Sequence, residues 1–348
     1  MTDPQRNEAP LGERKEKILT ALTEAYIRTG EPVGSKWLVE RLDHAVSSAT
    51  IRNEMAELDA MGYLEQPHTS AGRIPTAKAF RLYVDKLMQP RPLSAETRGE
   101  IDEELSRAAD PDELMHDASQ VLVRETGCAA VTTTPVEPSA VLRRVEILLM
   151  SARSAAIVLM TGSGVLRSRV CRLMAPVSPE TLRTLSQMLT RTFVGRELTE
   201  IGLPRVQSLL TSLGEEGLLC VPVLTAFYEL AQAAAASEVL LDGQLNLLRN
   251  PDFAPERVHS LLGFLSEQSQ LSHLLALHSG GLRVMFGSEG RRPELIGSSL
   301  IVTRYTPPGS DGVMGLIGPQ RMDYAAAIPT LTYVADTVQR LFEQFTKE

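Results

Sequence analysis

The chain has 348 residues, of which 43% are hydrophobic and 22% charged, and its formal net charge is -8. This composition is ordinary for a globular protein that is long enough for two or three domains. We find no apolar run of the roughly 18 residues that a membrane span requires, and the polar N-terminus argues against a secretory signal. We therefore expect a cytoplasmic protein without a membrane partner, in which the scattered Cys128, Cys171 and Cys220 are buried or inert reduced thiols.

The distribution of charge is more informative than its sum. Residues 1–91 contain 13 basic and 13 acidic residues, so the acidic excess lies entirely in the rest of the chain. Between residues 66 and 91, Asp85 is the only acidic residue against five basic ones, which are Arg73, Lys78, Arg81, Lys86 and Arg91. One basic segment in an otherwise acidic protein predicts a local surface for phosphate groups.

Three short helices are predicted in the first 62 residues. The first covers about Leu11–Arg28, where apolar residues recur at helical spacing. The second begins at Ser35, a favourable N-cap, and the third is capped by Ser47 or Ser48. Gly62 follows the third helix, where a left-handed residue is expected. Three helices of this length, the last two joined by a tight turn, predict a helix-turn-helix unit.

A small hairpin is predicted directly after this unit. Tyr63–Gln66 reads as a strand, Pro67–Gly72 as a loop and Arg73–Pro75 as the returning strand, before Thr76 caps another helix. A helix-turn-helix followed by a hairpin is a winged helix. In Gln89–Pro92 every second residue is proline. Alternating prolines favour extended backbone, which predicts a semi-rigid linker.

Beyond the linker, helices and antiparallel strands alternate, which predicts an α+β architecture. Helices are expected at Glu96–Arg107 and Asp112–Glu125, from Ser178, at Pro255–Leu277 and at the C-terminus. Strands are expected at Cys128–Thr134, Val145–Met150, Ala155–Thr161, Val165–Leu173, Glu238–Asp242, Arg283–Phe286, Ser299–Tyr305 and Val313–Ile317. We interpret the glycines at Gly162–Gly164 and Gly309–Gly315 as hairpin turns rather than phosphate-binding loops.

The start of the third helix has the side chains that a DNA groove can admit. Its first residues are small and polar, and their backbone amides can meet phosphates. Arg52 and Asn53 lie away from the apolar face of the helix, and these residue types read guanine and adenine by paired hydrogen bonds. We therefore predict base reading by Ser48, Thr50, Arg52 and Asn53, and phosphate contact by Ser47. The alternative is a solvated face, since helix-turn-helix units also occur in protein-binding domains.

The hairpin loop and the following helix supply further candidates. Pro67 and Pro75 stiffen the ends of the loop, and Gly72 permits tight backbone at its tip, so Arg73 is expected near the apex, in a minor groove or on a phosphate. The predicted phosphate or minor-groove contacts are Ser47, His68, Thr69, Ser70, Arg73, Lys78 and Arg81. For Lys78 and Arg81, which we expect to point outward, the alternative is that they only keep the helix soluble. His68 has no neighbouring second ligand for a metal.

Signatures of catalysis are missing from the sequence. We find no GxxxxGK[ST], GxGxxG, HExxH or GxSxG pattern, and the six histidines are dispersed. We therefore expect neither an enzyme nor a bound metal or cofactor.

The segment VSSATIRNEMAELDAMGYLEQPHTSAGRIPT (Val46–Thr76) closely resembles the N-terminal domain of the bacterial HrcA family of heat-inducible transcription repressors. The resemblance continues through AKAFRLYVDKLM, and EPVGSKWLVE precedes it. Further matches are DGQLNLLRNPDF (Asp242–Phe253) and VMGLIGPQRMDY (Val313–Tyr324). The matches span nearly the whole chain in the order of the family, apart from a polar extension of about ten residues before Leu11.

The resemblance implies a homodimeric repressor of heat-shock chaperone operons. Such a repressor binds a double-stranded inverted-repeat operator called CIRCE and depends on the chaperonin GroEL for its active form. The implied architecture is a winged helix at residues 1–89, a linker at 90–95, and a GAF-like α+β domain at 96–142 and 238–348, interrupted by an inserted α+β dimerisation domain at 143–237. Two alternatives remain: a metabolite-responsive regulator that binds a small molecule through the GAF-like domain, and a protein-interaction module or enzyme with a structural winged helix.

Overall fold

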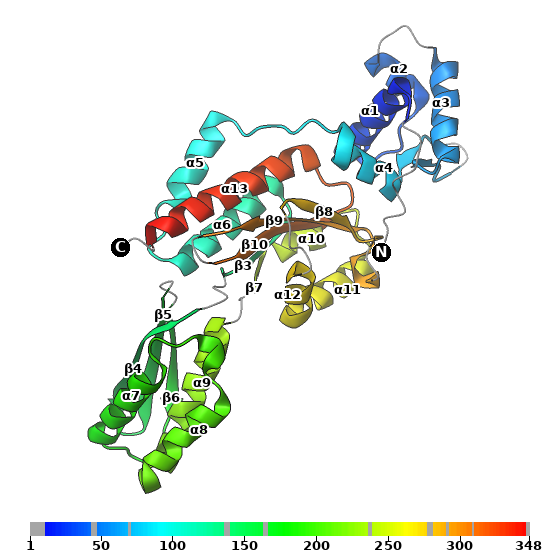
Figure 1. Ribbon diagram of the computed structural model, residues 1–348. Coiled ribbons are helices and arrows are strands. Elements are labelled where there is room, and N and C mark those ends of the chain that lie inside the picture. Colours follow the sequence, from blue (N-terminus) through cyan, green and yellow to red (C-terminus); the bar gives the residue numbers. More distant parts are fainter. Residues whose placement is uncertain are drawn as a thin grey trace.

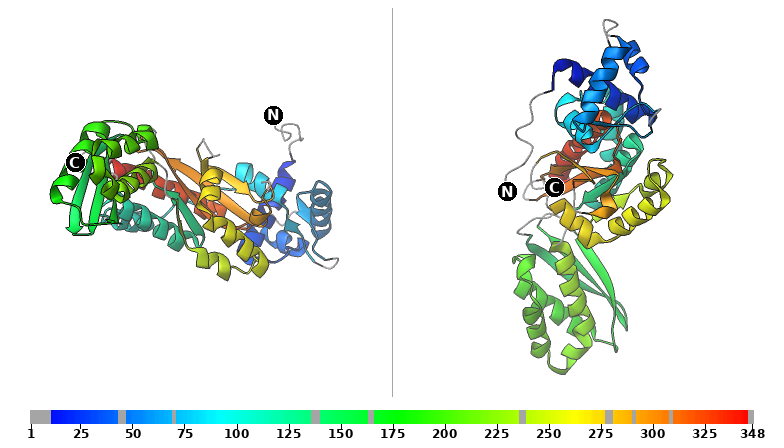
Figure 2. Two further views of the ribbon diagram at one scale, coloured as in Figure 1. Left: turned by 90° about the horizontal axis from the view of Figure 1, so that it is seen from below. Right: turned by 90° about the vertical axis from the view of Figure 1, so that its right-hand side faces the viewer.

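The computed structural model describes residues 11–42, 47–68, 71–135, 140–162, 166–235, 239–276, 281–289, 292–307 and 310–345. These residues form an N-terminal helical domain, a central domain built on a sheet, and a module inserted into the central domain (Figure 1). The two further views show an elongated molecule in which the central domain lies between the other two parts (Figure 2). The predicted α+β multidomain class is confirmed.

The N-terminal domain is a winged helix. Its elements are α1 (Glu13–Thr29), α2 (Ser35–Arg41), α3 (Ser48–Ala60), β1 (Leu64–Glu65), β2 (Ile74–Pro75), α4 (Ala77–Leu82) and a π-helical turn at Tyr83–Leu87. Strands β1 and β2 pair antiparallel, and Arg73 also bridges to Val33, which acts as a third short strand. Buried Ile18, Leu22 and Leu58 belong to the core that holds the three helices together.

Local signals in the sequence set the ends of these helices. Gly30 and Gly62 have φ of 71° and 79°, the left-handed region where a side chain is strained. Ser47 is the N-cap of α3, and its hydroxyl accepts the amide hydrogen bond of Thr50. One detail was predicted wrongly, because the cap of α2 is Gly34 and Ser35 is already its first helical residue.

The central domain is a five-stranded antiparallel sheet with helices on both faces. Its strand order is β7-β3-β10-β9-β8. The strands are β3 (Ala129–Thr133), β7 (Val239–Asp242), β8 (Arg283–Phe286), β9 (Ser298–Tyr305) and β10 (Gly312–Pro319). On β9, Ile301 packs with the helices of one face and Val302 with those of the other, and both are buried. A sheet covered on both sides explains why these strands are nearly continuous apolar runs.

The helices of the central domain divide between the two faces of the sheet. One face is covered by α5 (Ala95–Leu105), α6 (Pro111–Thr126) and α13 (Tyr324–Phe345). The other face is covered by α11 (Pro255–Ser266) and α12 (Gln268–Ala276), with the short α10 (Gln244–Arg249) beside them. The prediction of one long helix over 255–277 was wrong, because Glu267 leaves the helical conformation, with φ -87° and ψ 91°.

Helix α13 contains a proline in its interior. Pro329 has no amide hydrogen, so the carbonyl of Ala325, four residues earlier, lacks its usual partner in the helix. The backbone amide of Arg91, in the linker after the winged helix, donates a hydrogen bond to this carbonyl at 2.7 Å. The linker is therefore held against the start of α13.

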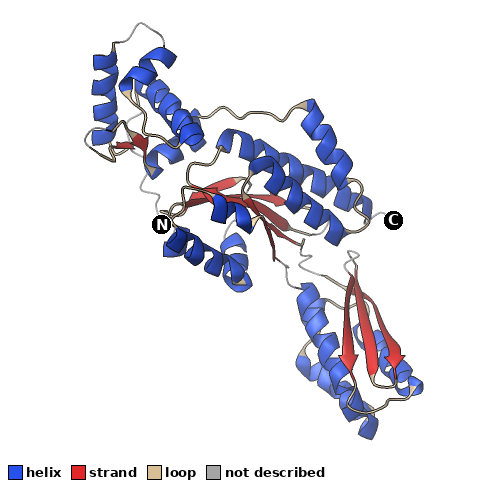
Figure 3. Cartoon of the chain, turned by 180° about the vertical axis from the view of Figure 1, so that it is seen from behind, coloured by secondary structure: helices blue, strands red, loops and turns tan. Residues whose placement is uncertain are grey.

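The inserted module is a three-stranded antiparallel sheet packed against helices. It contains β4 (Leu142–Ser151), β5 (Ser154–Thr161), β6 (Leu166–Arg172), α7 (Pro179–Phe193), a 3-10 turn at Leu198–Glu200, α8 (Leu203–Ser212), a 3-10 segment at Gly214–Cys220 and α9 (Val221–Ala235). Seen from behind, its strands are separate from the central sheet (Figure 3). The chain leaves the central sheet after β3 and returns in β7, and these two strands pair with each other. The insert is therefore an extension of one hairpin.

The boundaries of the insert and the GAF-like identity of the central domain stay proposals. Ala140 and Leu142 are already buried in the core of the inserted module, so we place its start a few residues before the expected 143. The turn expected at Gly162–Gly164 lies mostly outside the described residues, as does Gly309.

One segment of the insert, Gly217–Ala235, is long and apolar enough to cross a membrane by length and composition alone. The sequence-based expectation of no such run was therefore too strict. Val223 and Phe227 on this segment are fully buried in the core of the module, so one side of α9 packs against its sheet.

The three cysteines are buried and free, as expected. Burial raises the pKa of Cys128 to about 11, which disfavours the reactive thiolate.

Candidate nucleic-acid interface

The start of α3 is built from small hydroxyl side chains. The Ser47 hydroxyl accepts the amide of Thr50 at 3.1 Å and lies 3.0 Å from the Thr50 hydroxyl. The hydroxyl of Ser48 lies 3.1 Å from that of Ser35, the first residue of α2. These contacts bring the starts of α2 and α3 together without a bulky side chain between them, which leaves the entrance of α3 accessible.

Arg52 and Asn53 lie on the exposed side of α3. The opposite side carries Ile51, Met55 and Leu58, which are 1%, 5% and 0% exposed. Within the described parts of the chain, neither the Arg52 nor the Asn53 side chain has a hydrogen-bond or ion-pair partner. Their fork-shaped polar groups are thus available for the edges of bases, and their base-reading role stays a prediction.

The acidic residues of α3 are neutralised from within the domain. The Lys15 ammonium of α1 contacts the carboxylates of Glu54 and Glu57, both at 2.8 Å, and the hydrogen bond to Glu54 is the main cause of its raised pKa. The third carboxylate, Asp59, pairs with Arg73 at 2.8 Å. These pairs reduce the repulsion that three unpaired carboxylates on α3 would exert on nearby phosphates.

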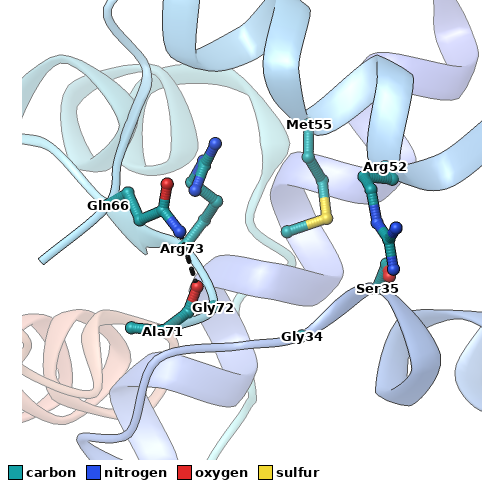
Figure 4. A pocket seen from close by; sticks show the side chains of 8 residues that line it. All are labelled: Gly34, Ser35, Arg52, Met55, Gln66, Ala71, Gly72 and Arg73. Atoms are coloured by element: carbon teal, nitrogen blue, oxygen red, sulfur yellow. Dashed lines mark hydrogen bonds between the residues drawn. The ribbon is translucent and has the colours of Figure 1, made fainter. Parts of the chain in front are cut away.

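A cavity of about 390 Å³ lies between α3, the start of α2 and the wing (Figure 4). Its lining residues are Gly34, Ser35, Arg52, Met55, Gln66, Ala71, Gly72 and Arg73. Arg52 and Arg73 lie on opposite sides of it, with Met55 between them. Because Arg73 is paired with Asp59, Arg52 is the cation of this hollow that remains open to a ligand.

Arg73 lies at the base of the wing and not near its apex, which corrects the expectation from sequence. Its backbone exchanges two hydrogen bonds of 2.9 Å with Val33, and its side chain, 20% exposed, reaches back to Asp59 on α3. Gly72 is also not a tip residue. A Cβ atom at this position would lie 2.4 Å from the carbonyl oxygen of Val33, so the glycine permits the wing to approach that strand closely.

Replacing Gly72 by alanine should therefore destabilise the winged helix by about 2–4 kcal/mol, because the added methyl group separates the backbone of Arg73 from Val33 and costs their hydrogen bonds. Thermal unfolding measures the loss. Gly99→Ala is the matched control, since a Cβ atom there meets nothing within 4 Å on the exposed side of α5. Equal unfolding temperatures for the two variants would refute the close-approach explanation.

Lys78 does not point outward as expected. Its ammonium donates a hydrogen bond of 3.0 Å to the carbonyl of Met61, the C-cap of α3, and lies 4.4 Å from the centre of the Tyr63 ring. A cation at the C-terminal end of a helix stabilises it through the helix dipole. We infer that Lys78 holds the end of α3 in place, and this replaces our assignment of a phosphate contact.

We accordingly expect Lys78→Ala to lower the free energy of unfolding by about 1–2 kcal/mol, through the lost helix-end and cation–π contacts. The dependence of DNA affinity on salt should stay as in the wild type. Thermal unfolding and DNA titrations over a range of KCl concentrations test both parts, with the exposed Lys86→Ala as control. A phosphate contact would instead reduce the slope of log affinity against log salt by about 0.9.

The prediction that Arg81 contacts DNA is corrected most clearly. Its guanidinium contacts both carboxylate oxygens of Glu289 and donates a hydrogen bond of 2.8 Å to the carbonyl of Val284, both in the central domain. Burial alone would lower the pKa of Arg81, but the carboxylates of Glu289 and Asp85 together outweigh this and raise it. The side chain is held between domains, so we withdraw it as a DNA contact. Arg91 likewise pairs with Asp323, which leaves little of the predicted basic segment as a phosphate surface.

The rest of the wing is partly described. His68 is exposed, and its carbonyl accepts the amide of Ala71 at 2.9 Å. Thr69 and Ser70 lie outside the described residues. Gln66, which sequence reasoning missed, donates a hydrogen bond of 3.0 Å to the Ala71 carbonyl across the wing. Ser35 was missed as well, because its place beside Ser48 depends on how two helices cross and not on any local pattern.

Comparisons with known proteins agree with this geometry. The family model described as "Winged helix-turn-helix transcription repressor, HrcA DNA-binding" matches residues 10–87, and the model described as "HrcA protein C terminal domain" matches residues 112–328. The curated heat-inducible transcription repressor HrcA of Moorella thermoacetica is 34% identical over 339 residues, which cover 96% of this chain and 98% of the relative. That of Geobacter sulfurreducens is 33% identical over 341 residues, covering 96% and 98%.

A solved structure described only as that of a hypothetical protein has the same fold. Its TM-score is 0.68 and its identity 24%, and the match covers 97% of this chain and all of the other. Among the described residues, no group of three or more His, Cys, Asp or Glu side chains is arranged to hold a metal ion. The winged helix, the two family models and the near full-length relatives together show that the chain belongs to the HrcA family of heat-inducible transcription repressors, which are DNA-binding proteins and not enzymes.

Proposed function

We propose that this protein represses heat-shock chaperone operons as a homodimer that binds an inverted-repeat operator of the CIRCE type. Each protomer inserts the start of α3 into the major groove of one half-site, and the wing lies against the flanking backbone. The observation that carries this proposal is the exposed pair of Arg52 and Asn53 behind an entrance of small hydroxyl residues. Occupancy of the operator is enough to block transcription, so no chemical step is required, and the protein acts in the cytoplasm.

The inserted module offers a surface for the second copy. Side chains of its sheet alternate, and those pointing away from the helices form the outer sheet face. Its apolar residues are Leu148, Ala156, Val158, Met160, Leu166 and Val170, and the polar Arg144, Glu146, Ser168 and Arg172 lie on the same face. Their inward neighbours Ala155, Ile157 and Leu159 are fully buried, whereas Leu148, Leu166 and Val170 are 52%, 55% and 66% exposed. Large exposed apolar side chains with charged residues beside them are typical of a protein–protein contact. A twofold pair would bury it on both copies at once.

The same face supports a chaperonin partner. We propose, from membership of the family, that the chaperonin GroEL maintains the active repressor. A single protomer exposes Leu148, Leu166 and Val170 of this face, at 52%, 55% and 66%. Chaperonins hold apolar surface of this type until it is buried. When unfolded proteins occupy the chaperonin under stress, protomers would lack this protection, dimers would decline and the operons would open.

A gel-shift titration tests the function. Purified protein is mixed with a CIRCE-type duplex and with a scrambled duplex of the same length, with and without GroEL and ATP. We expect a shift of the inverted repeat at much lower protein concentration, and a larger active fraction with the chaperonin. Equal binding to both duplexes by a folded dimer would contradict the proposal. Activation by a small molecule without chaperonin would instead indicate a metabolite-responsive regulator.

A further inference from the structure

The winged helix and the central domain share one hydrophobic core. The Phe80 ring of α4 lies 6.2 Å from that of Phe286 and 6.3 Å from that of Tyr324, measured between ring centres. Tyr26 of α1 extends the group, 6.4 Å from Phe80. Phe80, Phe286 and Tyr324 are at most 2% exposed. Rings buried this completely between two domains hold them in a defined arrangement, whereas a linker alone would leave them free to turn.

An arginine of the winged helix reaches into the central domain at the edge of these rings. The Nε atom of Arg81 lies 2.8 Å from one carboxylate oxygen of Glu289, and the guanidinium group lies 4.7 Å from the centre of the Phe286 ring. The Glu289 carboxylate also accepts the backbone amide of Phe286 at 3.1 Å, which fixes its position. The geometry is directional, because a planar guanidinium that pairs with a carboxylate and stacks on a ring has few alternative orientations.

A second arginine makes the reciprocal contact. Arg321, in the turn between β10 and α13, donates a hydrogen bond of 3.0 Å to the carbonyl of Ile27 in the last turn of α1, and its Nε atom lies 2.6 Å from Asp252. It packs so closely that a Cβ atom on Gly30 would lie 3.0 Å from its guanidinium carbon. Arg321 of the central domain thus stabilises the C-terminal end of α1, at a point separate from Arg81.

These contacts leave the recognition helix free. They involve α1 and α4, while α3 lies on the side of the winged helix away from the central domain (Figure 1). The docked arrangement is therefore compatible with α3 entering a groove. The inserted module, which carries the outer sheet face, lies at the opposite end of the molecule (Figure 2). We call the contact between the winged helix and the central domain the joint. In a dimer formed through the outer sheet face, any rotation at this joint changes the distance between the two α3 helices.

We propose that Arg81 and Arg321 are positioning residues that fix the direction of α3 and so restrict each dimer to one spacing of operator half-sites. This rests on the proposed function, in which a dimer reads an inverted repeat. Adding one base pair to the spacer moves a half-site by about 3.4 Å and turns it by about 34–36° around the DNA axis. A joint held at two separate points cannot follow this rotation, whereas a loosened joint can.

The first experiment measures affinity for three duplexes, a CIRCE-type inverted repeat and versions with the spacer lengthened or shortened by one base pair. The variants are Arg81→Met and Arg321→Met, which keep an alkyl stem for packing but lose the charged group. The matched control is Arg107→Met, which breaks an exposed pair with Glu103 on α5. Two variants from opposite sides of the joint keep the test meaningful where one of them fails to fold.

For the wild type and Arg107→Met we expect affinity to fall about tenfold or more when the spacer changes. For Arg81→Met and Arg321→Met we expect weaker binding to the original duplex and a spacer penalty of less than about threefold, since a loose joint gives up preorganisation but tolerates rotation. An equal loss of affinity on all three duplexes would leave the spacer penalty as large as in the wild type. This result would show a purely structural role and overturn the inference.

The second experiment needs no DNA. Nitroxide labels on Ala56→Cys of α3 and Asp336→Cys of α13, both exposed, report the distance between the two domains, and the native cysteines are buried. A narrow distribution in the wild type that broadens in both methionine variants supports the joint, and identical distributions refute it. If the wild type ignored inverted repeats altogether, the proposed function would fail, and this distance measurement would still decide whether the two arginines fix the domains.

Discussion

Val170→Asp should convert the proposed dimer to a monomer and remove the proposed preference for an inverted repeat. Val170 lies on β6 opposite Ala156 of β5, in the outer sheet face, and is 66% exposed in the protomer, so the substitution leaves the folded protomer intact. In a twofold pair the carboxylate is buried without a partner on both copies, which costs several kcal/mol each time. Losing the second half-site should then weaken operator binding by about 10²–10⁴-fold.

Sedimentation velocity gives the oligomeric state, and titrations on an inverted repeat and on a single half-site give the affinities. Leu245→Asp is the control, because Leu245 on α10 is similarly exposed, at 62%, but belongs to the central domain. We expect Val170→Asp to bind both duplexes with the same low affinity, while the control stays dimeric. A Val170→Asp protein that remains a dimer would move the dimer contact away from the outer sheet face.

Arg52→Ala should have the second-largest effect, and it should be confined to the correct sequence. A base-reading arginine contributes roughly 1–3 kcal/mol of discrimination, and a dimer carries it in both half-sites. Affinity for the operator should therefore fall by roughly 2–6 kcal/mol, while affinity for a scrambled duplex changes little. The guanidinium is exposed on α3 and makes no ion pair with any described residue, so its removal should leave protein stability unchanged.

Titrations on operator and scrambled duplexes, each at two salt concentrations, separate these possibilities. Lys17→Ala is a suitable control, because it removes the same charge from α1, where Lys17 pairs with Glu13, without touching α3. A phosphate contact at Arg52 would weaken both duplexes alike and flatten the salt dependence, which is the result that would remove it from the base-reading set.

The winged helix could be predicted closely from sequence because its signals are local. Ser47 and Thr76 cap helices three residues before the amides that they accept, and Gly62 ends α3 in the left-handed region. The hairpin from β1 to β2 follows from strand-forming residues on either side of a loop rich in proline and glycine. Each of these features depends on a few neighbouring residues and needs no knowledge of the rest of the chain.

The basic segment was misread for the opposite reason. The charges of Arg73, Lys78 and Arg81 are evident in the sequence, but their partners are not. The partner of Arg81 is Glu289, 208 residues later, and that of Lys78 is a backbone carbonyl at the end of another helix. Composition reports how many charges a segment carries, whereas the fold decides which of them remain for a ligand. Arg52 and Asn53 stay in the candidate site because their side chains form no hydrogen bond or ion pair with a described residue.

Pro329 shows how an apparent defect in a helix can have a use elsewhere. In an exposed helix interior, replacing proline by alanine stabilises by about 3 kcal/mol, so automated stabilisation schemes would select this position early. Here the amide that alanine restores would compete with the Arg91 amide for the Ala325 carbonyl and loosen the linker that follows the winged helix. An engineered repressor made more heat-resistant in this way would have a more stable α13, but the orientation of its winged helix on the promoter would be less well fixed.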